Sequence, residues 1–345
     1  MNLKTKTAIV ILNWNGKAFM ERFLSGIAQS LDKQDARLVI VDNASTDGSA
    51  KWLQNAFPAV ELITLDRNYG FTGGYNRGLQ QIEAEYYVLL NSDVEVGEGW
   101  LAPLVEYLDA NPQVAACAPK ILSCHSPNMF EYAGAGGGFI DKYGYPFCRG
   151  RILDHIEPDN GQYNSLVSVF WASGAALAIR AELFHSAGGF DEDFFAHMEE
   201  IDLCWRLQLM GFTIANVPQS TIYHVGGGTL PNNSPRKLYL NYRNSLLMLL
   251  KNLQRRPFVT LFIRLILDGC SAAIYLLSGQ FASFGVVVKA HWAFFGKLPQ
   301  YIKKRQQQKR LTSAKSNLKI YNGSIVYRYF KSGKTLKFSD IKMKY

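Results

Sequence analysis

Acidic residues that could do chemistry stand at the ends of two apolar runs in this 345-residue sequence. Asp42 follows four apolar residues and precedes a turn, where its carboxylate could accept a hydrogen bond from the N3–H of uracil or thymine. Taken alone, it is better interpreted as a helix N-cap or an Asx-turn. Asp93 ends a second apolar run, as part of Asn91-Ser92-Asp93. It could offer a hard oxygen ligand to Mg²⁺ or Mn²⁺, although such a strand end is usually a solvated turn.

The densest acidic cluster lies in residues 191–206, DEDFFAHMEEIDLCWR, where Glu199, Glu200 and Asp202 fall within four positions. On a helix Glu199 and Asp202 share a face, and Glu200 lies about 100° away from Glu199. Apolar and acidic neighbours raise the proton affinity of a carboxylate, as a general base requires. A solvated acidic helix start is the alternative. The aromatic flanks weigh against it: Phe194, Phe195 and Trp205.

His224 follows a strand-like run and precedes Gly226-Gly227-Gly228-Thr229. Its imidazole could bind a metal, and the glycines could bring backbone N–H groups to a diphosphate. A lone histidine is more often a structural hydrogen-bonding residue. Sugar transfer from a nucleotide diphosphate needs a base pocket, a divalent cation and a carboxylate that takes the acceptor proton. The residues above could together supply all three.

The elements that would position these residues alternate in the first half of the chain. Short β-branched runs predict strands, and the segments between the first three predict helices (strands 7–12, 36–43, 60–65 and 86–94; helices 18–30 and 49–57). A glycine-rich loop is expected at 68–78. This order predicts an α/β fold with a doubly wound, mostly parallel sheet. Ligands of such sheets bind beyond the carboxyl ends of the strands, where Asn13, Asp42 and Asp93 stand.

The rest of the chain divides by composition. Residues 124–165 read as irregular, 181–211 as helical with a break at Gly188-Gly189, and 238–250 and 257–296 as apolar helices. We therefore expect one domain over 1–235, divided into residues 1–110 and 111–235; the resemblance given below implies that these are the nucleotide-sugar half and the acceptor and catalytic half of a catalytic domain. A basic, apolar helical region follows at 236–345.

Charge is distributed unevenly between these parts. Residues 1–230 carry a net charge of −11 and residues 231–345 one of +20, which predicts an anionic partner for the second part. Nucleic acid is disfavoured, because no binding motif is present and the acidic part repels polyanions. The run 269–288 has no ionised group and is long enough to span a bilayer, which takes about 20 residues. We favour helices lying in the interface of an anionic membrane, with a hairpin packed on the catalytic domain as the alternative.

Cysteine usage and the first residues bear on the compartment. The five cysteines are an odd number with no C-x-x-C pair, which suits a reducing environment. The first apolar run is too short for a signal peptide. The expected location is the cytoplasmic face of the cell membrane, peripheral or monotopic.

The motifs above occur in an order that is itself informative. They are Asn13-Trp14-Asn15-Gly16, Val41 to Asp47, Asn68-Tyr69-Gly70-Phe71, Gly74 to Gly78, Leu89 to Asp93, Glu199 to Leu203 and His224 to Gly227. In this order, over about residues 5–250, the chain resembles glycosyltransferase family 2, most closely its rhamnosyltransferase-like branch.

The resemblance implies a GT-A fold and an inverting, Mg²⁺- or Mn²⁺-dependent transfer from a nucleotide sugar. Nucleotide-sugar contacts are then expected from Asn13, Asp42, Asn68, Gly70, Asn76 and Asp93. Asp93 and His224 would hold the metal. Glu200 would be the catalytic base, with Glu199 and Asp202 competing for that role, and Asp202 could instead pair with Arg206. Trp205 and Arg206 are the expected acceptor contacts.

Two departures from the family pattern and several alternatives remain. Position 91 is Asn where many members have Asp, and position 200 is Glu instead of Asp. A Gln-x-x-Arg-Trp motif of processive polymerases is absent, so one sugar per encounter is expected.

The donor could be a UDP- or dTDP-sugar such as dTDP-rhamnose, and the acceptor a glycan or a lipid-linked glycan of the cell surface. A non-catalytic nucleotide-sugar-binding protein is the alternative. A dinucleotide oxidoreductase is disfavoured, because no G-x-G-x-x-G follows the first strand.

Overall fold

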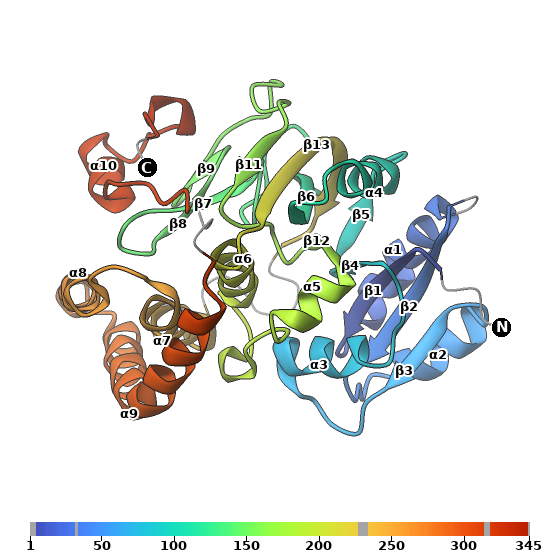
Figure 1. Ribbon diagram of the computed structural model, residues 1–345, viewed down its shortest axis with the longest axis horizontal. Helices are drawn as coiled ribbons and strands as arrows, with labels where there is room; N and C mark the ends of the chain where they lie inside the picture. Colours follow the sequence, from blue (N-terminus) through green and yellow to red (C-terminus); the bar gives the residue numbers. More distant parts are fainter. Residues whose placement is uncertain (1–4, 32–33, 227–233, 314–317, 344–345) are drawn as a thin grey trace.

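The computed structural model describes residues 5–31, 34–226, 234–313 and 318–343 (Figure 1). Its first half contains four parallel strands joined through helices: β1 (Thr7–Asn13), α1 (Lys17–Ser30), β2 (Ala36–Asp42), α2 (Ser49–Ala56), β3 (Glu61–Thr64), α3 (Gly70–Leu79) and β4 (Tyr86–Leu90). The four strands and the first two helices predicted from the sequence are confirmed.

The glycine-rich segment is a helix, so the predicted loop at 68–78 was wrong over most of its length. Its glycines serve close packing of α3 on the sheet. A Cβ at Gly74 would lie 2.7 Å from Leu12 Cδ1, and one at Gly78 would lie 2.5 Å from Val41 Cγ2. Any larger side chain would push α3 away from the strands, which outweighs the low helix propensity of glycine.

The main sheet has the strand order β11-β13-β6-β12-β4-β1-β2-β3, and β5 pairs with β13. The added strands are β5 (Val94–Val96), β6 (Val114–Ser123), β11 (Val167–Val169), β12 (Ala176–Arg180) and β13 (Thr213–His224). β12 inserts antiparallel between β4 and β6, whereas β13 runs parallel to β6. The sheet is therefore mixed, with a parallel block at β4-β1-β2-β3.

Helices cover both faces of this sheet (Figure 1). In β1 the side chains alternate, so that Ile9 and Ile11 join the core under α1, α2 and α4 (Leu101–Ala110). Ala8 and Val10 join the other core, under α3, α5 (Ala181–Ser186) and α6 (Glu199–Leu209). The doubly wound α/β architecture is confirmed.

Residues 124–165, expected to be irregular, contain a small antiparallel sheet of four strands: β7 (Gly138–Ile140), β8 (Pro146–Cys148), β9 (Arg151–Ile152) and β10 (His155–Ile156). Strands of two or three residues are too short to show a period in sequence. The chain end packs against this sheet through α10 (Ile325–Lys331), whose Ile325 N–H donates to the buried Asp141 at 2.9 Å.

Three long helices follow β13 and lie together beside α6: α7 (Pro235–Asn252), α8 (Pro257–Leu277) and α9 (Phe281–Leu311) (Figure 1). They confirm the predicted apolar helices. The uncharged run 269–288 is not one helix, however, because the chain turns at Ser278–Gln280 with Gly279 at φ +72°. α7 begins beside the predicted domain boundary at 235 and 236, and its Leu246 to Leu250 are buried in the same core as α6. The division into domains stays a prediction.

Candidate active site

The ends of β1 and β2 hold Asn13 and Asp42 side by side, because the two residues are in register in the parallel ladder. Asn13 Nδ2 donates to Asp42 Oδ1 at 2.8 Å, and the Ser45 N–H donates to Asp42 Oδ2 at 3.0 Å. The second bond is the local turn that Asp42 would form without any ligand. Each oxygen keeps a lone pair, so the carboxylate can also accept a bond from a base.

Asn68 and Gly70 begin α3. Asn68 Oδ1 accepts from Asn43 Nδ2 at 3.1 Å and from the Gly70 N–H at 2.8 Å. Gly70 has φ +73°, and a Cβ there would lie 2.5 Å from the Phe195 ring, so glycine is required on both counts. Asn43 was not singled out in the sequence, although its position directly after Asp42 was a signal. The Asn43 side chain links the end of β2 to the start of α3.

Asn76 does not face the same place as Asp42. Its Nδ2 donates to the Phe190 carbonyl and its Oδ1 accepts from the Phe190 N–H, both at 2.9 Å. It borders a hollow of about 560 Å³ that Asp42, Asp93, Glu200 and His224 do not line. The amide of Asn76 joins α3 to the segment after α5, and a contact of Asn76 with the donor stays a prediction.

Asp93 and His224 meet where β5 pairs with β13. His224 Nε2 lies 3.1 Å from Asp93 Oδ1 and 3.3 Å from Asn91 Nδ2, and Nδ1 lies 3.3 Å from Glu131 Oε2. Burial would lower the pKa of His224, but the bonds to Asp93 and Glu131 outweigh burial and raise it to about 10. Glu131 was missed because it lies in the segment without a sequence pattern.

These groups fit a divalent cation held jointly by protein and ligand. Once a cation displaces the proton from Nε2, this nitrogen and a carboxylate oxygen would supply two of its about six ligands, and a carboxylate on the other imidazole nitrogen orients the ring. Among the described residues no group of three or more His, Cys, Asp and Glu forms a metal site, so a diphosphate would have to complete the coordination. Gly226 packs on Glu131, whereas Gly227, Gly228 and Thr229 lie outside the described residues.

Glu199 and Glu200 open α6 beside the start of α3. Glu199 is buried and Glu200 half-buried, and Oε2 of each has no hydrogen-bond partner in the described part of the chain. Burial raises the pKa of Glu200 to about 7, and burial together with Glu200 raises that of Glu199 well above its usual value. A Cβ on Gly174 would lie 3.7 Å from Phe71 Cζ and 3.9 Å from Glu200 Cβ. Glycine there brings the acid and α3 together.

Asp202, Trp205 and Arg206 are structural by position. Asp202 is fully buried and binds Arg206 Nε at 2.8 Å, Lys251 Nζ at 2.8 Å and Asn252 Nδ2 at 2.7 Å. The pairing of Asp202 with Arg206 is confirmed. Trp205 is buried in the core against Phe170. Trp205 offers no surface to an acceptor, whereas Arg206 lines the hollow beside Asn76. The carboxylate of Asp202 is engaged by cations, unlike those of Glu199 and Glu200.

The segment between α5 and α6 is strained. Phe195, His197 and Met198 adopt left-handed backbone angles, with φ of 66°, 67° and 71°. Each such residue costs about 1–3 kcal/mol and persists only where its surroundings hold it. The Phe195 carbonyl accepts from the N–H groups of Phe71 and Thr72 at 2.9 and 3.2 Å, so this segment also fixes the start of α3.

A buried carboxylate at the end of β2, the contact between Asp93 and His224, and an acid pair without cations are the groups that a nucleotide-sugar transferase would need. The family model described as glycosyl transferase family 2 matches residues 8–165. Residues 8–165 therefore carry the sequence pattern of glycosyltransferase family 2, and the predicted enzyme class, a glycosyltransferase, is confirmed. Glu199, Glu200 and His224 lie beyond the matched residues, and their roles stay predictions.

The relatives include rhamnosyltransferases. An N-acetylglucosaminyl-diphospho-decaprenol L-rhamnosyltransferase of Mycobacterium tuberculosis is 26% identical over 239 residues, covering 63% of this chain and 75% of that protein. The dTDP-rhamnosyl transferase RfbF of Shigella flexneri is 27% identical, covering 66% of this chain and 76% of RfbF. The predicted rhamnosyltransferase-like resemblance is confirmed.

Solved structures show the same fold at low identity. A mannosyltransferase from Pyrobaculum calidifontis in complex with GDP-Man and Mn²⁺ has a TM-score of 0.50 at 15% identity, covering 90% of this chain and 88% of that one. GalNAc-T7 with UDP, GalNAc and Mn²⁺ has a TM-score of 0.55 at 16% identity, covering 72% of this chain and 48% of that one. The GT-A-like fold predicted from the sequence is confirmed.

Proposed function

We propose that this chain transfers one sugar, with inversion, from a dTDP- or UDP-sugar to a glycan or lipid-linked acceptor in cell-surface polysaccharide biosynthesis. dTDP-rhamnose is the first donor to test, because one relative carries that donor in its name. The observation that carries the proposal is the Glu199–Glu200 pair. Its unpartnered oxygens and raised pKa values lie beside the start of α3, next to the donor motifs.

In the proposed reaction Glu200 takes the proton of the acceptor hydroxyl as that oxygen attacks C1 of the sugar. The bond from C1 to the diphosphate breaks on the opposite face, which inverts the anomeric centre. A base whose pKa lies near 7 is half-ionised at neutral pH and transfers protons efficiently. Asp42 would accept from the N3–H that uracil and thymine share, so it would not distinguish UDP from dTDP.

Asp93 and His224 would hold Mg²⁺ or Mn²⁺, and the bound cation would supply positive charge to the leaving diphosphate. Glu131 would keep the His224 ring in place for this role. Two structural neighbours were solved with Mn²⁺, which supports the choice of cation for this fold.

Ligand-dependent melting tests donor and metal together. A ligand of the folded state raises the melting temperature, so dTDP-rhamnose or UDP-glucose with Mn²⁺ should stabilise the protein, whereas GDP-mannose should not. Excess EDTA should remove most of the effect. Asp42→Ala should weaken nucleotide binding by roughly 1–3 kcal/mol, the cost of a charge-assisted hydrogen bond. Equal shifts with all three nucleotides would contradict the role of Asp42, and full turnover in EDTA would contradict that of Asp93 and His224.

We propose further that α8 and α9 lie on the anionic cytoplasmic face of the cell membrane. The outer face of α8 carries an apolar stripe at helical spacing, and α9 adds more exposed aromatic side chains: Phe258, Phe262, Ile266, Ile274 and Leu277, then Phe281, Trp292 and Phe295. Exposed apolar surface of this extent marks an interaction site. The charge of +20 over residues 231–345 matches an anionic lipid surface.

Lying on the surface is favoured over crossing it. α8 has the length and composition of a membrane span, with 21 residues and a mean hydropathy of 1.7, but one such helix is weak support. Its other side carries the Arg264–Asp268 pair at 2.8 Å, which bonds to Ser245 and to Tyr145 of the folded domain. A helix held to the protein by a buried ion pair presents one face to lipid.

Vesicle binding tests this proposal. The protein should co-sediment with vesicles of phosphatidylcholine and phosphatidylglycerol, and high salt should weaken the binding without abolishing it, because apolar burial is not screened. The double variant Phe262→Ser, Trp292→Ser should stay in the supernatant. Tyr327→Ser is the matched control, since Tyr327 on α10 is as exposed (65%) as Phe262 (65%). Failure of the unaltered protein to bind at low salt would overturn the proposal.

A further inference from the structure

We propose that Lys304 and Lys297 of α9 are positioning residues for the transfer reaction. They hold the segment 191–198 in the one conformation that presents Glu199 and Glu200 to the donor. The inference rests on the proposed role of Glu200 as the base. It assigns to the basic C-terminal region a function in positioning active-site residues, separate from membrane binding.

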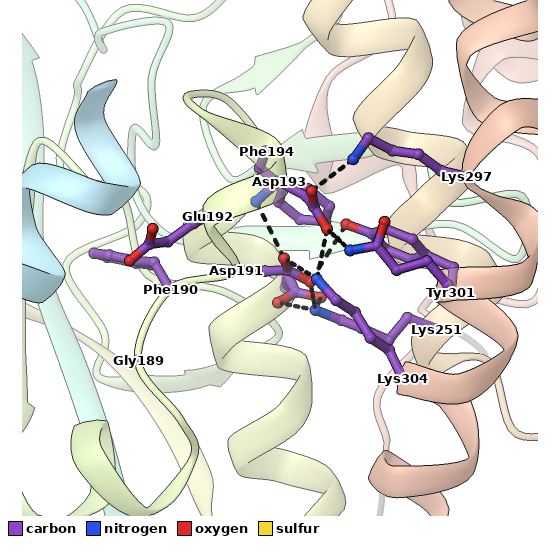
Figure 2. A network of polar contacts seen from close by, with 12 residues as sticks. Gly189, Phe190, Asp191, Glu192, Asp193, Phe194, Lys251, Lys297, Tyr301 and Lys304 are labelled. Atoms are coloured by element: carbon purple, nitrogen blue, oxygen red, sulfur yellow. Dashed lines mark hydrogen bonds and ion pairs between the residues drawn. The ribbon is translucent and has the colours of Figure 1, made fainter. Parts of the chain in front are cut away.

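The acidic side chains at the start of this segment are enclosed by cations from two helices (Figure 2). Asp191 lies 2.7 Å from Lys251 of α7 and 2.5 Å from Lys304 of α9. Asp193 lies 2.7 Å from Lys304 and 2.6 Å from Lys297. Lys304 therefore bridges both carboxylates, and Lys251 continues the network to Asp202 inside α6.

The backbone of the same segment is held from α7. Arg243 donates to the carbonyls of Asp193 and Phe194 at 2.8 and 3.1 Å. Asn244, which is fully buried, donates to the carbonyls of Phe194, Ala196 and His197 at 2.8–3.0 Å. α7 thus holds the main chain while α9 holds the side chains.

This enclosure accounts for the left-handed residues that end the segment. Phe195, His197 and Met198 would relax to ordinary backbone angles if the chain were free, and Met198 is the residue on which α6 begins. Relaxation would move Glu199 and Glu200. It would also move the Phe195 carbonyl, to which the N–H groups of Phe71 and Thr72 are bonded. The acids and the donor side of the site are therefore coupled through one segment.

α9 can do this while it faces lipid, because its two roles use different faces. Lys297 and Lys304 are seven residues apart, on the side of the buried Tyr301. Trp292 and Phe295 of the same helix are 73% and 44% exposed. A helix that served only as a membrane anchor would need no lysines paired with acids of the catalytic domain, so the network is better explained by the segment that it holds.

Three variants of α9 separate positioning from folding and from general charge. Lys304→Met removes the bridge, Lys304→Arg keeps a cation, and Lys303→Met removes a neighbouring lysine that is exposed. Backbone amide exchange is measured on the full chain without substrate. Peptides covering 70–72 and 191–200 should exchange faster in Lys304→Met, be largely restored in Lys304→Arg and be unchanged in Lys303→Met, while peptides of the central strands β1 and β4 keep their exchange rates in all three.

Kinetics with dTDP-rhamnose and Mn²⁺ provide the second measurement, as release of dTDP. Lys304→Met should lower kcat by about 10- to 100-fold, the range for a displaced catalytic group, and leave KM for the donor near its original value. Lys304→Arg should recover most of kcat. Unchanged exchange at 191–200 in Lys304→Met would overturn the inference, as would equal loss of kcat in Lys304→Met and Lys303→Met. If the unaltered protein releases no dTDP, the proposed donor fails, and exchange alone decides whether Lys304 positions the segment.

Discussion

Two acid pairs lie within ten residues of one another and have opposite electrostatics. Asp191 and Asp193 are surrounded by lysines: burial alone would raise the pKa of each, but Lys251, Lys297 and Lys304 outweigh it and lower both. Glu199 and Glu200 face no cation within ion-pair distance in the described structure, and burial raises the pKa of both. The first pair is fixed as charged and serves structure. In the second pair Glu200 is about half-ionised near neutral pH, so it can take up and release a proton.

The difference comes from the elements packed against each pair. α7 and α9 present lysines to Asp191 and Asp193, whereas Glu200 lies against Gly174 and near Phe71. The excess of cations after residue 230 is thus partly used inside the protein. The charge of +20 predicted an anionic partner, and the ion pairs of Lys251, Lys297 and Lys304 show that acids of the protein itself match part of it.

The largest expected effect comes from removing the ionisable group of Glu200, which belongs to the acid pair without a cation. Glu200→Gln should preserve the fold and donor binding while lowering kcat by about 10²–10⁴-fold, the usual contribution of a general base. Initial rates with saturating donor, together with the donor-induced melting shift, measure the two properties separately. Glu98→Gln, at an exposed position, is the control. A near-normal rate in Glu200→Gln with a collapse in Glu199→Gln would move the base by one residue.

The same chemical change in the paired cluster should reduce stability. Asp191→Asn removes a charge whose side chain is 6% exposed and leaves Lys304 with Asp193 alone. We expect the free energy of unfolding to fall by roughly 3 kcal/mol, the low end of the range for breaking a buried ion pair. The loss is at the low end because Lys251 retains its ion pair with Asp202. Denaturant titration measures it.

The control for Asp191→Asn is Glu61→Gln. Glu61 also pairs with a cation, Arg37 at 2.9 Å, but the two side chains are 39% and 34% exposed. A surface pair of this kind contributes about 0–1 kcal/mol. Equal losses in the two variants would show that the enclosure of Asp191 adds nothing beyond a surface ion pair.

The sequence predicted what local pattern determines. The β-branched runs predicted the parallel strands, and the polar residues at their ends predicted where Asn13, Asp42 and Asp93 would stand. The helix α3 was missed because glycine usually signals a loop, and only the packed structure shows Gly78 against Val41. The sequence alone does not show whether a glycine allows close packing of a helix or permits a turn.

The contacts that distinguish the two acid pairs were not predictable. Asp191 meets Lys251 and Lys304, which are 60 and 113 positions away in the chain, and no short period connects them. Glu131, beside His224, was missed for the same reason. From the sequence, Asp202 was as good a candidate base as Glu199, and only its contacts with Arg206, Lys251 and Asn252 separate them.

The smallest expected effect is a pH-dependent gain in stability, opposite in sign to that of Asp191→Asn. The folded pKa of Glu200 is raised from 4.5 to about 7, so between these values the folded protein keeps a proton that the unfolded chain has lost. Stability conferred by that proton falls as pH rises through this window. Glu200→Gln cannot lose a proton, so at pH 8 it should be more stable than the unaltered protein by roughly 1–3 kcal/mol. Below about pH 4.5 Glu200 is protonated in both states, and the difference should vanish.

Melting temperatures from pH 4 to 8 measure this difference in stability, with Glu98→Gln expected to follow the unaltered protein throughout. A Glu200→Gln curve parallel to that of the unaltered protein would show that Glu200 is already ionised in the fold, and the two acid pairs would then differ in position alone.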